Sequence, residues 1–61
     1  MNTFGRLCLG DMFNTMTARW VKTSPTEAIC VMSAIHPLGT IKQFEEDDEN
    51  IVLLWSAVLK S

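Results

Sequence analysis

The chain has few of the residues that stabilise very small proteins. Of its 61 residues, two are cysteines and one is a histidine, with no Cys-x-x-Cys pair and no His-rich tract. Cys8 and Cys30 are too few for a disulfide scaffold, so we expect two ordinary buried thiols. These shortages argue against a structural metal site, and no metal or cofactor is expected.

Long apolar runs are also missing. The longest, residues 51–59, is about half of a membrane-spanning helix and is interrupted by Ser56. No charged stretch followed by an apolar run and a small-residue cleavage site begins the sequence. We therefore expect a single small domain over residues 1–61 that is cytoplasmic, keeps its thiols reduced and does not contact a membrane.

Apolar residues are abundant by contrast. They make up 48% of the chain, including two tryptophans and four methionines. A chain of this length buries only about 60% of the surface that its unfolded form exposes. We therefore expect part of the apolar surface to face a partner or another copy of the chain.

The charges are unevenly distributed along the sequence. Residues 1–44 contain four basic and two acidic residues, a net charge of +2, whereas residues 45–61 contain one basic and five acidic residues, a net charge of −4. The overall charge of −2 lacks the basic surplus that drives non-specific phosphate binding. One compact acidic segment, residues 45–49, therefore follows a mildly basic body.

Turn residues divide the chain into segments of strand length. A single helical turn is expected at residues 3–7, and a Gly-Asp turn at Gly10-Asp11. Aromatic and β-branched residues predict strands at residues 12–16, 18–23, 28–32, 40–44 and 51–55. Five short strands with tight turns predict a mainly β fold, either a small SH3-like five-stranded barrel or a curved sheet.

An α+β fold is the alternative. Residues 24–27 read Ser-Pro-Thr-Glu, which has the form of a capping box, and apolar residues follow at helical spacing. Acidic residues precede the apolar run that starts at Ile51, and Lys60 lies near its end, as suits a helix dipole. This alternative predicts helices near residues 25–35 and 48–60.

Several short motifs together resemble a group of small phage- and prophage-encoded proteins. They are Phe4, Leu7, Gly10-Asp11 and Phe13, then Trp20-Val21-Lys22-Thr23-Ser24, then Ala28, and an acidic turn before a final apolar strand. The resemblance covers most of residues 4–54. It implies a β-rich fold, a mobile-element origin and the cytoplasm of a host cell, but no activity. The His36-Pro37 insertion and the apolar tail after residue 55 depart from the pattern.

Catalytic constellations are not evident in the sequence. His36 stands alone before Pro37, which favours a solvated side chain in a turn. Asp11 and Glu27 are isolated carboxylates at turns, where local backbone hydrogen bonds account for them. The acidic segment lacks the central glycine of a calcium loop. We therefore expect a protein that is not an enzyme.

The leading hypothesis is a non-catalytic protein-interaction module, an accessory or inhibitory factor of a phage or prophage. The residues expected to contact the protein partner are Met16, Trp20, Trp55, Glu45, Glu46, Asp47, Asp48 and Glu49. One alternative is a small nucleic-acid-binding barrel, in which Trp20 stacks on a base while cations meet phosphates. Its residues are Arg19, Trp20, Lys22 and Lys42. A structural homo-oligomer is the third possibility.

Overall fold

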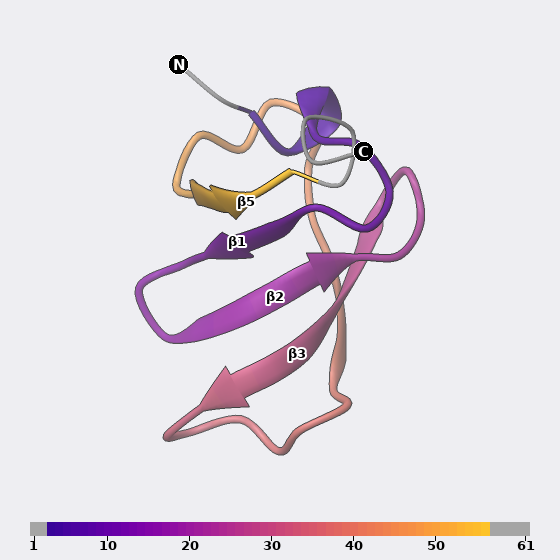
Figure 1. Ribbon diagram of the computed structural model, residues 1–61. Coiled ribbons are helices and arrows are strands. Elements are labelled where there is room, and N and C mark those ends of the chain that lie inside the picture. Colours follow the sequence, from indigo (N-terminus) through magenta and orange to yellow (C-terminus); the bar gives the residue numbers. More distant parts are fainter. Residues whose placement is uncertain (1–2, 57–61) are drawn as a thin grey trace.

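The computed structural model describes residues 3–56 and contains a single five-stranded antiparallel sheet. The elements are the 3₁₀-helix η1 (Phe4–Arg6) and the strands β1 (Met12–Asn14), β2 (Ala18–Lys22), β3 (Glu27–Ser33), β4 (Ile41–Gln43) and β5 (Val52–Trp55). The strand order is β4-β3-β2-β1-β5, and Figure 1 shows the curvature of the sheet. The mainly β prediction is confirmed in its curved-sheet form, because β4 and β5 form opposite edges and do not close a barrel in the described residues.

The helix predicted near residues 25–35 is wrong, because this segment forms β3. The Ser24 Oγ donates to Glu27 Oε1 at 3.2 Å and accepts from the Thr26 N–H at 3.3 Å. The residues of the apparent capping box therefore close the hairpin turn between β2 and β3 instead of starting a helix. The helix predicted near residues 48–60 is wrong at residues 52–55, which form β5, and residues 57–61 lie outside the described part of the chain.

The N-terminal segment agrees with its prediction. The expected helical turn is present as η1, and a turn follows in which Gly10 has a φ of 91°. Residues that have a Cβ rarely adopt this left-handed backbone conformation, which explains why a glycine occupies this position. The Asp11 carboxylate accepts the Cys8 N–H at 2.9 Å, as expected for a carboxylate that stabilises its own turn.

Four aromatic rings form the centre of the core on the inner face of the sheet. Phe44 stacks on Phe4 with centroids 4.7 Å apart and an interplanar angle of 12°. It also meets the rings of Phe13 and Trp20 edge to face, at 5.4 and 5.5 Å. Such pairs add about 0.5–1.5 kcal/mol each beyond their burial. Phe44 thus connects the segment after β4 to η1, β1 and β2.

The two thiols differ in their surroundings. Cys30 is buried in the core, whereas Cys8 is exposed and both are free. The prediction of two buried thiols is therefore wrong for Cys8, which lies in the turn between η1 and β1 rather than on the inner face of the sheet. In the part of the chain that the structure describes, no helix is long and apolar enough to cross a membrane.

Lys22 lies in the core, on the same face of β2 as Trp20. Alternation along a strand sends both residues inward, and Lys22 is only 4% exposed. Its Nζ donates to the carbonyl oxygens of Phe4 and Leu7, both at 2.8 Å, and lies 4.5 Å from the centroid of the Phe4 ring. The buried ammonium therefore fixes η1 over the inner face of β2.

The backbone of the acidic segment packs on the other side of η1. The Phe4 N–H donates to the backbone carbonyl oxygen of Asp48 at 2.9 Å, and the Gly5 N–H donates to that of Glu46 at 2.8 Å. The Asp48 carboxylate accepts the Asn50 N–H at 2.9 Å, which turns the chain toward β5. In Figure 1 this segment runs back from β4 past η1 to β5. The acidic segment thus has a structural role in its backbone, while most of its carboxylates face solvent.

The first prediction concerns the buried lysine. Lys22→Met removes both hydrogen bonds to the carbonyls while keeping most of the side-chain volume, so we expect a loss of about 2–4 kcal/mol in the free energy of unfolding. Lys42→Met is the matched control on the exposed strand β4, and we expect a change within about 1 kcal/mol. Urea denaturation measures both. Equal effects of the two variants would show that burial of the Lys22 ammonium has no special importance.

The second prediction concerns the contact between η1 and the acidic segment. A Cβ on Gly5 would lie 2.9 Å from the Glu46 carbonyl oxygen and 3.1 Å from the Glu46 Cβ. Gly5→Ala should therefore lower the free energy of unfolding by about 1–3 kcal/mol. Glu46→Ala keeps both contacting atoms and serves as the control, with little expected change. A fully stable Gly5→Ala variant in thermal denaturation would contradict this packing.

Candidate binding surface

The outer face of the sheet carries a continuous row of apolar side chains. β1 to β4 each contribute a residue that alternates with inward-facing residues, and β5 contributes Trp55, which a register shift places opposite Met12. In the order of the strands they are Ile41, Ile29, Val21, Met12 and Trp55. Ile41 and Trp55, at the two ends, are 62% and 42% exposed, and the three between them are half-buried. We refer to these five residues as the apolar row.

More apolar side chains flank the apolar row. Val31 and Met32 are exposed on β3, and Val52 and Leu54 are exposed on β5. Between them, Asn14 faces Arg19 across β1 and β2, and the Arg19 Nε donates to the Asn14 Oδ1 at 3.3 Å. This pair is polar, as is the pair formed by Glu27 and Gln43 on β3 and β4. Contiguous apolar surface of this kind is uncommon on monomeric proteins and marks interaction sites.

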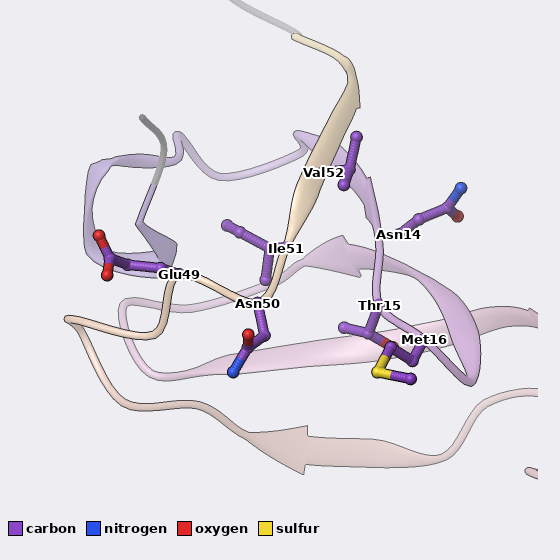
Figure 2. Close-up of a pocket in the computed structure, with 7 residues that line it drawn as sticks. All are labelled: Asn14, Thr15, Met16, Glu49, Asn50, Ile51 and Val52. Atoms are coloured by element: carbon purple, nitrogen blue, oxygen red, sulfur yellow. The ribbon is translucent and has the colours of Figure 1, made fainter.

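A pocket of about 370 Å³ opens at one corner of the sheet, where β1 ends and β5 begins. Its lining residues are Asn14, Thr15, Met16, Glu49, Asn50, Ile51 and Val52. Figure 2 shows Thr15 and Met16 on one side and Asn50 and Ile51 on the other. Because Asn14 and Val52 also belong to the outer face, this pocket joins that face to the end of the acidic segment.

A second hollow of about 310 Å³ adjoins the first around Thr15, Met16 and Asn50. Lys42 and Asp48 contribute charges of opposite sign to its lining. Met16 stands between the two hollows and is 99% exposed. A fully exposed methionine at a hairpin tip contributes nothing to the core, and its flexible side chain suits contact with another molecule.

Two of the residues predicted to bind a partner or nucleic acid are in the core instead. Trp20 is fully buried, and its Nε1 donates to the Thr15 Oγ1 at 3.0 Å, so its ring has no open face for a partner or a base. Lys22 is occupied by the carbonyls of Phe4 and Leu7. The predictions for these two residues are corrected: period-two alternation directs both of them to the inner face of β2.

The other predicted residues lie at the surface, and their roles remain predictions. Trp55 ends the apolar row, while Met16, Asp48 and Glu49 come together at the two hollows. The remaining acidic side chains, Glu45, Glu46 and Asp47, are exposed. Arg19 lies on the outer face, but the Lys42 Nζ lies near the rings of Phe44 and Trp20, at 4.9 and 5.9 Å from their centroids.

The reactive side chains of the described residues form few constellations. His36 Nε2 lies 3.3 Å from Thr17 Oγ1, and its ring centroid lies 5.7 Å from that of Trp20. This contact links the β1–β2 and β3–β4 loops. Within residues 3–56, no group of three or more His, Cys, Asp or Glu side chains is placed to hold a metal ion.

Sequence reasoning missed the apolar row. Its members are separated along the chain and become neighbours only through the strand register, which includes a shift between Arg19 and Trp20 and another between Met12 and Phe13. The available signal was that residues 28–32 are apolar on both faces of the expected strand. No protein-family model, curated protein or solved structure matches the chain.

Proposed function

We propose that the protein is a non-catalytic protein-interaction module that binds its partner through the outer face of the sheet. The observation that supports this proposal best is the apolar row, which crosses all five strands on the face opposite the core. Covering such side chains gains roughly 25 cal/mol per Å² of apolar surface removed from water. Binding is therefore favoured without any reacting group.

The charges around the outer face define the chemistry of the partner. Glu49 is one of the residues that line the corner pocket, and the carboxylates of Glu45, Glu46 and Asp47 are exposed. A complementary partner is a folded protein with an apolar surface that has basic side chains at its border. With the mobile-element origin that the resemblance implies, we propose an accessory or inhibitory factor that acts on a host or phage protein.

The nucleic-acid alternative has weaker support. It relied on Trp20 as a stacking ring and on Lys22 as a phosphate contact, and both side chains are buried. Arg19 and Lys42 are left, in a chain with a net charge of −2. Two separated cations provide little of the counterion release that drives phosphate binding.

The third prediction tests the outer face by photo-crosslinking in cells that express the full chain. A photoreactive residue at Ile41 or Trp55, at opposite ends of the apolar row, should capture the same protein. The control position is Thr23, which is exposed at the β2–β3 turn. Capture of the same protein from Thr23 with equal yield, or of none from either row position, would overturn the proposal.

The captured protein then allows a direct affinity measurement. In a binding titration with that purified protein, Ile41→Glu combined with Trp55→Glu should raise the Kd by about tenfold or more, because charges replace apolar contacts. Thr23→Glu should leave it unchanged. Circular dichroism of each variant verifies that the fold is kept.

The fourth prediction concerns the acidic segment in the same titration. Reversing Glu45, Glu46 and Asp47 to lysine leaves the hydrogen bond between Asp48 and Asn50 in place. We expect slower association, and a difference from the unmodified chain that shrinks as salt is added, because screening weakens exposed charges. An identical association rate at low salt would exclude the acidic segment from recognition.

A further inference from the structure

The two edges of the sheet differ in how they are protected. β4 is only three residues long, and its central residue, Lys42, pairs with the inward-facing Ala28. The Lys42 Nζ lies 4.9 Å from the centroid of the Phe44 ring, over the core side of the sheet. Short edge strands and inward-pointing charges are devices by which proteins prevent a foreign strand from pairing.

β5 lacks such a charge, although it too is short, at four residues, and its pairing with β1 contains a register shift. Its four residues, Val-Leu-Leu-Trp, include no charge, proline or glycine. Val52, Leu54 and Trp55 are exposed, with 64%, 44% and 42% of their surface accessible. Among residues 3–56, β1 is the strand that pairs with β5, which leaves the opposite side of β5 as a sheet edge. An exposed apolar edge strand is a template for pairing with another chain.

We propose that the protein forms a symmetric dimer in which β5 of one copy pairs with β5 of a second copy. The contrast between the edges selects this partner. Pairing β5 with β4 of a neighbour would require the protected edge and would leave a free β5 to continue the chain of contacts. Pairing β5 with itself closes the assembly, buries both open edges, and leaves two protected β4 edges outside.

The charges and the two faces of the sheet set the direction of this pairing. A two-fold axis perpendicular to the sheet makes the two β5 strands antiparallel and keeps both outer faces on one side. It also separates the acidic segments, which precede β5 in each copy. A parallel pair would place five negative charges of each copy side by side and turn the two outer faces to opposite sides.

The dimer would extend the surface described above. Each apolar row ends at Trp55 on β5, so the two rows would approach each other across the new interface. This inference does not depend on the proposed partner, because it concerns the chain alone. The dimer would present two outer faces on one side of a continuous sheet.

The fifth prediction tests the dimer with purified full-length protein by sedimentation equilibrium, over about 1–100 µM because mass action governs the population. We expect a two-copy species. Leu54→Lys, which places a charge on the β5 edge, should raise the dimer dissociation constant by about tenfold or more. Ile41→Lys is the matched control, since it places the same charge at an exposed apolar position on the β4 edge, and it should leave dimerisation unchanged.

Hydrogen exchange distinguishes edge pairing from packing of the outer faces and does not depend on a variant. As the concentration rises, amides of β5 should gain protection while those of β4 stay unchanged. A monomer at about 100 µM would overturn the proposal. So would β5 amides protected equally at all concentrations, or a dimer that Ile41→Lys abolishes and Leu54→Lys preserves.

Discussion

The ammonium group of Lys22 is the interaction on which the rest of the structure depends. It joins β2 to the carbonyls of Phe4 and Leu7, which lie 18 and 15 residues earlier in the chain. Burying a charge is costly unless hydrogen bonds replace water, and here two carbonyls and an aromatic face surround it. η1, held in this way, offers its N–H groups to the backbone of the acidic segment. A chain of contacts therefore runs from the centre of the sheet to the segment that leads into β5.

This arrangement explains how residues 3–56 cover one face of the sheet and leave the other open. η1 and the segment after β4 pack on the inner face, where Phe4 and Phe44 complete the aromatic cluster. The described residues contain no further element that could form a layer on the outer face. The described residues thus cover one face of a five-stranded sheet whose strands carry apolar residues on both faces. The apolar row lies on the face that they leave uncovered, and this is the physical reason to propose a partner.

The sequence predicted the strands better than their arrangement. Turn residues such as Gly10 marked the boundaries, since a φ of 91° requires a glycine and leaves a recognisable signal. β3 was ambiguous because the Ser24–Glu27 contact forms in a hairpin turn as well as in a helix. Burial of Lys22 was accessible from the sequence, because alternation along β2 places it on the same face as Trp20. The apolar row was not, since it depends on bulges that shift the register between distant segments.

The polar side chains lead to the same view of function as the apolar ones. Asp48 accepts the Asn50 N–H, Ser33 Oγ donates to the Thr17 carbonyl, and Glu27 Oε1 accepts from Ser24 Oγ. Side chains that could do chemistry are in these cases committed to closing turns, as expected where a small core leaves the backbone little other support. The exposed groups among residues 3–56 include most carboxylates of the acidic segment and several apolar residues of the outer face. Such a surface gains free energy when another molecule covers it, which is the physical basis of the proposed binding function.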